Sequence, residues 1–159
     1  LNYAIFRPAV VIGPGVGFVS EIAPIVKMPI VPIFGDGKYS FQPVDRRVLA
    51  RCVASAVEHP EAKNETLELY GERTWCYVEI IDEIGKALGK NRVRKLHLPL
   101  WFVKPMVYAT GWLPFAPITP DQLKMLVEGN TGNGRNAPEI FGVEWIDLPD
   151  ALRYTFDNM

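Results

Sequence analysis

A glycine-rich turn is the first segment of this chain whose residue types could do chemistry. Residues 13–17, with the sequence GPGVG, follow an apolar run and precede a helical pattern. Backbone N–H groups in such a setting can cradle a phosphate. However, Pro14 removes one donor, and the Gly-x-Gly-x-x-Gly spacing of a dinucleotide site is absent. A plain turn is therefore the favoured interpretation.

Two adjacent arginines, Arg46 and Arg47, are the next candidates, because they begin a helix predicted over residues 45–58. They could contact an anion, although a solvated helix face is the favoured interpretation. His59 and His97 have no Cys, Asp or Glu at ligand spacing, so the sequence predicts no metal site. No tyrosine is followed four residues later by a lysine, and we predict no catalytic residue in this chain.

The elements that must position these residues follow from hydrophobic spacing and end signals. Asp45 can cap the helix over 45–58, and Thr119 and Gln122 form a capping box. Strands or extended segments are expected over 2–12, on either side of the turn at 35–37, over 65–71 and around 93–98; further helices are expected over 18–28, 75–88, 99–113, 120–128 and from about 147. Strands and helices alternate early and helices dominate late, which predicts an α/β fold with a parallel sheet.

The first predicted strand raises a question of its own. Tyr3, Ile5 and Phe6 suit a buried strand, which Arg7-Pro8 ends. Parallel strands are normally buried between neighbours and helices. We therefore expect the neighbours of this strand to lie upstream of the chain.

Composition limits the classes of function. The chain has 159 residues and a formal net charge of -1, so it carries neither a basic field for nucleic acid nor a polybasic membrane anchor. Cys52 and Cys76 lie far apart and no signal peptide is visible, which favours two free thiols and a cytoplasmic location.

Several segments, taken in order, carry a resemblance to a known family. They are RPAVVIGPG, FGDGKYSFQPV, the helix ending CVASAVEHP, and ETLELYGERTWCYVEIIDEIGKALGK. Together they resemble the C-terminal half of an extended or atypical short-chain dehydrogenase/reductase of the NAD-dependent epimerase/dehydratase type. LPFAPITPDQLKMLVEGNTG followed by FGVEWIDLPDAL looks most like the branch related to the 39 kDa-type NAD(P)H-binding accessory subunit of respiratory complex I.

The resemblance implies the C-terminal part of a Rossmann-like parallel sheet with a small, mostly helical substrate-side lobe. Residues 1–95 would belong to the Rossmann-like domain, with interleaved lobe segments, and residues 96–159 would form the helical lobe. The N-terminal half, with the Gly-rich cofactor turn and a Tyr-x-x-x-Lys pair, would be missing. The intact protein would bind NAD or NADP, and the fragment alone would bind neither.

The resemblance also implies site residues. Pro8, Ala9, Val10 and Val11 would lie beside the nicotinamide, where apolar backbone keeps water away from hydride transfer. The competing interpretation is that these four residues are simply part of the strand core. For the fragment alone, this second interpretation is the stronger one.

On the substrate side, the phosphate-binding Arg of nucleotide-sugar enzymes is replaced by Ser40, Phe41 or Gln42, and Val48 takes the place of the usual Asp. Both departures argue against a nucleotide sugar. Gln42 with Pro43 is what the respiratory-subunit-like branch tends to carry.

Residues 96–117 form a strongly apolar stretch that includes Trp101. Lys104, Pro105 and Gly111 interrupt it, which argues against a transmembrane helix. Core or a substrate-pocket wall is favoured over contact with a membrane surface or a partner. We thus name Gln42, Arg46, Arg47 and Trp101 as substrate-side candidates.

The leading hypothesis is the C-terminal portion of an NAD(P)-dependent oxidoreductase or epimerase that acts on a small, apolar or quinone-like substrate and is inactive without its N-terminal half. The alternative is a non-catalytic nucleotide-binding accessory or assembly factor, peripheral to the membrane, whose region 96–117 contacts a partner or membrane surface. A self-standing α/β interaction module is the third hypothesis.

Overall fold

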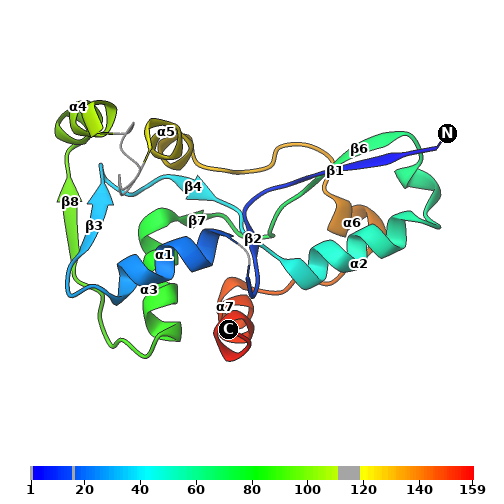
Figure 1. Cartoon of the computed structure of the whole chain (residues 1–159). Coiled ribbons are helices and arrows are strands. Elements are labelled where there is room, and N and C mark those ends of the chain that lie inside the picture. Colours follow the sequence, from blue (N-terminus) through cyan, green and yellow to red (C-terminus); the bar gives the residue numbers. More distant parts are fainter. Residues whose placement is uncertain (1, 16, 111–118) are drawn as a thin grey trace.

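The computed structural model describes residues 2–15, 17–110 and 119–159 (Figure 1). The strands of these parts are β1 (Ala4–Pro8), β2 (Val11–Ile12), β3 (Val31–Phe34), β4 (Ser40–Phe41), β5 (Val44–Asp45), β6 (Glu65–Leu69), β7 (Trp75–Cys76) and β8 (Lys95–Leu98). The helices are α1 (Gly17–Lys27), α2 (Arg46–Ala56), the short 3-10 helix η1 (Pro60–Ala62), α3 (Tyr77–Ala87), α4 (Leu100–Thr110), α5 (Pro120–Glu128), α6 (Ala137–Phe141) and α7 (Leu148–Asp157).

The strands associate in pairs, most of them parallel. β1 pairs in parallel with β6, from Ala4 opposite Glu65 to Pro8 opposite Leu69. β2 pairs in parallel with β5 and β3 with β8, whereas β4 and β7 are antiparallel. Parallel partners distant in the chain, joined through helices, confirm the predicted α/β fold.

The β1–β6 pair lies at one end of the molecule, beside the N-terminus (Figure 1). The apolar character of β1 predicted a buried strand, but Tyr3 is 51% exposed and Ile5 is 48% exposed. The physical reason is that β6 is the only sheet neighbour of β1 among the described residues. The other edge of β1 remains open.

The largest core lies where α1, α3 and α7 pack together. Val19, Ile81 and Leu152 are each fully buried there. The sequence predicted all three helices, and the side chain of Asp147 caps α7 by accepting a hydrogen bond from the N–H of Leu148 at 2.8 Å. Within this region, α1 packs against β2 and β3, and α7 packs against β2.

A second core lies between α2, α6 and β6 and contains Val48, Cys52 and Leu67. The hydrophobic pattern of the sequence does not predict α6, which is only five residues long. Two residues mark the ends of α6 in the sequence. Pro138 lies in its first turn, and Gly142, which has a φ of +62°, follows its last residue. A helix of this length has too few positions to display a hydrophobic period.

The two predicted regions of the chain are interleaved. The expected boundary between residues 95 and 96 falls inside β8, which pairs with β3. Beyond it, α6 packs on α2 and α7 packs on α3. Residues 137–157, which form α6 and α7, thus pack against helices that precede residue 95. The capping box of Thr119 and Gln122 at the start of α5 is confirmed.

No helix in the described parts of the chain has the length and apolar character needed to cross a bilayer. The helix predicted over 99–113 is seen as α4, which includes Pro105. Residues 111–117 of the apolar stretch lie outside the described residues.

The buried core predicts a loss of stability at alkaline pH. Burial raises the pKa of the Cys52 thiol from 9.0 to about 11 and that of the Tyr77 hydroxyl from 10.0 to about 12. The folded protein then holds these protons more tightly than the unfolded chain does. The stabilisation is complete below about pH 9 and is lost as the pH rises through about 11 and about 12.

We expect the free energy of unfolding in urea to fall by roughly 1–3 kcal/mol between about pH 9 and about pH 11. Tyr77→Phe should flatten the dependence above about pH 10, whereas Tyr108→Phe, at a side chain that is 68% exposed, should leave it unchanged. A free energy of unfolding that stays constant or rises over this range contradicts the prediction.

Candidate cofactor and substrate edge

The carboxyl ends of β1 and β6 form the edge where a ligand would be expected. Ligands of open α/β sheets bind outside the carboxyl ends of parallel strands. Here the chain leaves the sheet at Pro8, which is exposed, while Ala9, Val10 and Val11 are half-buried. The N–H of Ala9 donates to the Leu69 carbonyl at 2.9 Å, so this turn is fixed to the end of β6. The sequence-predicted cofactor segment thus presents an apolar surface at the appropriate edge.

Residues 13–15 form a turn that other parts of the chain hold in place. Gly15 has φ of +72°, a conformation that favours glycine. Arg46 donates from Nη1 to the Pro14 carbonyl at 2.9 Å, and a Cβ on Gly13 would collide with the Arg46 side chain. This arrangement matches the plain turn favoured from the sequence.

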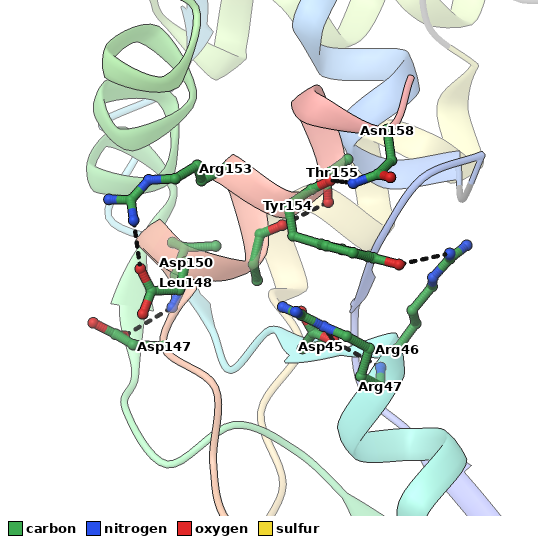
Figure 2. A network of polar contacts seen from close by, with 11 residues as sticks. Asp45, Arg46, Arg47, Asp147, Leu148, Asp150, Arg153, Tyr154, Thr155 and Asn158 are labelled. Atoms are coloured by element: carbon green, nitrogen blue, oxygen red, sulfur yellow. Dashed lines mark hydrogen bonds and ion pairs between the residues drawn. The ribbon is translucent and has the colours of Figure 1, made fainter.

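The polar contacts around the start of α2 are drawn in Figure 2. Asp45 is only 1% exposed, and its carboxylate caps α2 by accepting from the N–H of Arg47 at 2.6 Å. The Arg47 guanidinium donates to the same carboxylate from Nε at 2.9 Å and from Nη2 at 2.7 Å. The hydrogen bond to Asp45 raises the pKa of Arg47. A buried carboxylate is stable only with a cation or hydrogen-bond donors beside it, and Arg47 supplies both to Asp45.

Tyr154 of α7 completes this network. The Arg47 guanidinium lies 4.0 Å from the centre of the Tyr154 ring, and Arg46 Nη2 lies 3.5 Å from the Tyr154 hydroxyl (Figure 2). The two arginines therefore join α2 to α7 and to the turn at 13–15. They are not a freely solvated helix face, as the sequence had favoured, because they bind groups distant in the chain.

Gln42 joins three loops near the same edge. Its side-chain Oε1 accepts from the N–H of Gly132 at 2.9 Å, and its Nε2 donates to the Gly71 carbonyl at 3.3 Å. Its own backbone N–H donates to the Asn130 carbonyl at 2.9 Å. The carboxamide predicted to face a substrate thus already has a partner at each end.

Sequence reasoning missed the residues that fix the loop over β6. Glu68 accepts from the N–H groups of Asn133 and Gly134 at 2.8 and 2.9 Å. The buried side chain of Asn136 binds both the N–H and the carbonyl of Tyr70, each at 3.2 Å. Asn136 with a proline two residues later, Pro138, was a usable signal for a helix start, but nothing local in the sequence points to Tyr70 as the partner of Asn136.

Trp101 lies apart from the other candidates. It is on α4, which packs with β8 and α5 at the end of the molecule away from the β1–β6 pair (Figure 1). Val103 and Val107 of α4 are buried, but Trp101 is 77% exposed. The two valines therefore belong to a core, whereas Trp101 does not, and its place on the substrate side stays a prediction.

No group of His, Cys, Asp and Glu side chains in the described parts could hold a metal ion. Cys52 and Cys76 are free thiols, as expected.

No protein-family profile and no curated protein sequence matches this chain. Solved structures are similar. UDP-glucose 4-epimerase from Thermotoga maritima, solved with UDP-glucose, has a TM-score of 0.68 at 21% identity, over 99% of this chain and 46% of that protein. UDP-glucuronic acid 4-epimerase from Bacillus cereus, solved with UDP-glucuronic acid and NAD, gives 0.62 at 19% identity, over 98% and 44%. RMD from Pseudomonas aeruginosa, solved with NADPH, gives 0.63 at 13% identity, over 96% and 46%.

These similarities establish the fold. The chain has the α/β architecture of a little under half of these epimerase structures. It spans less than half the length of the structures that it matches.

The Asp45–Arg47 pair can be tested by a double-mutant cycle. Arg47→Ala leaves a buried carboxylate without its cation, and we expect it to lower the free energy of unfolding by about 1–3 kcal/mol. Asp45→Ala should cost about 1–3 kcal/mol, because the helix cap is lost as well. The double variant should cost less than the sum of the two by about 1 kcal/mol.

Arg51→Ala is the matched control, because Arg51 is an exposed arginine of the same helix. It should change the free energy of unfolding by no more than about 0.5 kcal/mol. Strict additivity of the Asp45 and Arg47 effects in urea unfolding contradicts the assigned pair.

Proposed function

We propose that this chain is the C-terminal portion of an NAD(P)-dependent oxidoreductase or epimerase, in which it completes the Rossmann sheet and supplies the substrate-side lobe. The observation that carries the proposal is the open edge of β1. An open hollow of about 500 Å³ lies between the start of the chain and the end of α2, and its lining includes Tyr3, Phe6, Val53 and Val57. Apolar side chains along an unpaired strand favour a further strand and its helix as their covering.

The structural neighbours support this proposal. Each of them contains, beyond the part that this chain matches, a region about as long again. In the proposed protein, an equivalent region supplies the strand beside β1 and the Gly-rich turn that binds the cofactor pyrophosphate.

The residues at the carboxyl edge fit one part of such a cofactor. Pro8 is exposed and has no N–H to satisfy, and the segment from Ala9 to Val11 is apolar. These residues would border the nicotinamide of NAD or NADP and exclude water from its face. The bound cofactor would supply hydride transfer. The turn at 13–15 does not fit the pyrophosphate, because Pro14 offers no donor and its carbonyl binds Arg46.

The contacts on the substrate side favour a small, uncharged and apolar or quinone-like substrate over a nucleotide sugar. Recognition of a nucleotide diphosphate relies on cations with free donors. Arg47 is engaged by Asp45, and Gln42 is engaged by Gly71 and Gly132.

A non-catalytic accessory role in the manner of the 39 kDa-type respiratory subunit is the second candidate. The exposed aromatic side chains of α4 favour it, because catalysis gives them no evident task. A test for oxidation of bound NADH by a quinone analogue separates the two candidates, since the accessory protein would bind the nucleotide without turnover.

Cofactor binding is the direct test of the proposed function. We expect the full-length protein to quench or shift the fluorescence of NADH or NADPH in a saturable titration. Pro8→Glu should weaken binding at least about tenfold, because it places a carboxylate beside an anionic cofactor. Met125→Glu, at an α5 side chain that is 67% exposed, is the control and should bind as the parent does.

A folded full-length protein that binds neither nucleotide contradicts the proposal. Equal weakening by Pro8→Glu and Met125→Glu contradicts the placement of the cofactor at residues 8–11. Thermal unfolding curves for each variant establish that the protein remains folded.

A further inference from the structure

The loop that leads into α6 contains the one Asn-Gly pair of the sequence, Asn133 followed by Gly134. Both residues are exposed. Asparagine before glycine is the pair most prone to deamidation, because the backbone nitrogen of the following residue attacks the side-chain amide and glycine has no side chain to obstruct that approach. The sequence therefore places a reactive pair in the loop beside β6.

The reaction exchanges the side-chain amide of Asn133 for a carboxylate. The Gly134 nitrogen loses its proton and bonds to Cγ of Asn133, while the bond from Cγ to Nδ2 breaks and ammonia leaves with that proton. Water then opens the resulting succinimide at one of its two carbonyls, which gives aspartate or isoaspartate. The attack requires that the Gly134 N–H can lose its proton and that the nitrogen can move towards Cγ of Asn133.

Both backbone polar groups of Gly134 are engaged in the structure. Its N–H donates to Oε2 of Glu68 at 2.9 Å, and its carbonyl accepts from the Tyr70 hydroxyl at 3.0 Å. The N–H of Asn133 donates to the same Glu68 oxygen at 2.8 Å. Hydrogen bonds to an ionised acceptor are about twice as strong as those between neutral groups. The attacking nitrogen is therefore held by Glu68.

The charge of Glu68 also opposes the reaction. Loss of the Gly134 proton would leave a negative nitrogen beside a carboxylate, and a like charge nearby disfavours the charged form of a group. A carboxylate is far too weak a base to remove the proton of a peptide N–H. Glu68 therefore acts as a shield for this pair and not as a general base.

The strand β6 fixes Glu68 itself. Glu68 lies opposite Arg7 in the parallel β1–β6 pair, and its N–H donates to the Arg135 carbonyl at 2.9 Å. Its side chain is half-buried and lies 3.0 Å from the place that a Cβ on Gly134 would take. A larger residue at position 134 would therefore press on the carboxylate, so the site fits the glycine that makes the pair reactive.

We propose that Asn133 is a deamidation site of this protein and that Glu68 keeps it unreacted in the folded state. Either product places a carboxylate at residue 133, whose N–H donates to the Glu68 carboxylate, and the two like charges repel. Isoaspartate also adds one carbon to the main chain, which changes the spacing of the two N–H groups that share one oxygen. Deamidation therefore releases the loop from β6. The proposal is independent of cofactor binding.

The test is peptide mass spectrometry of the full-length protein incubated at neutral pH with and without urea. In urea we expect Asn133 to deamidate faster than Asn64 and Asn91, which precede larger residues. In the folded protein we expect the rate at Asn133 to be at least about tenfold lower than in urea. Glu68→Ala should raise the folded-state rate at least about fivefold, and Glu68→Gln should raise it less, because its amide oxygen still accepts. Glu72→Ala, at an exposed glutamate after β6, should leave the rate unchanged.

Equal rates at Asn133 in the folded protein and in urea overturn the shield, as does a rate in Glu68→Ala that is no higher than in the parent. Faster reaction at Asn64 or Asn91 than at Asn133 in urea overturns the site. A lower rate in Glu68→Ala means that the carboxylate promotes the attack, and the proposal is then wrong. If circular dichroism shows that Glu68→Ala does not fold, the parent with and without urea and Glu68→Gln decide the outcome.

Discussion

Backbone pairing of the first strand is the constraint on which the rest of the structure depends. In a β-strand, the N–H groups of successive residues point to opposite edges, so those of every second residue face the same neighbour. The N–H of Ala9 donates to Leu69, so the amides of Arg7 and Ile5 face β6, and those of Phe6 and Ala4 face the open edge. Pro8 is at a position whose N–H would also face the open edge, and proline has no N–H there to leave unpaired. Among the described residues, the strand is thus paired on one edge and unpaired on the other.

The carboxyl ends of β1 and β6 are fixed by polar contacts between distant segments. Arg46 and Arg47 connect the turn at 13–15, helix α2 and helix α7, while Gln42 connects the loops that contain Gly71 and Gly132. These contacts use side chains that sequence reasoning had assigned to substrate. What remains accessible at the edge is the apolar segment that begins at Pro8, which is suited to shielding a cofactor from water.

The sequence was a good guide wherever the signal was local. Periodicity and capping residues predicted α2 after Asp45 and α5 after Thr119, and end signals predicted a helix from about residue 147; all three helices are confirmed. Partners distant in the chain could not be predicted, because nothing near Arg47 indicates Tyr154 and nothing near Tyr70 indicates Asn136. Apolar composition could not distinguish the buried side of α4 from the exposed side that carries Trp101, because both sides are apolar.

The central claim is that another strand covers the open edge of β1 in the functional protein. Amide hydrogen exchange of residues 4–7 in the protein isolated from its natural host tests it most directly, because Pro8 has no amide and each remaining amide reports one edge. The account predicts that Ala4 and Phe6 are protected to the same degree as Ile5 and Arg7. Fast exchange at Ala4 and Phe6, with Ile5 and Arg7 protected, would mean that β1 is an edge strand and would contradict the account.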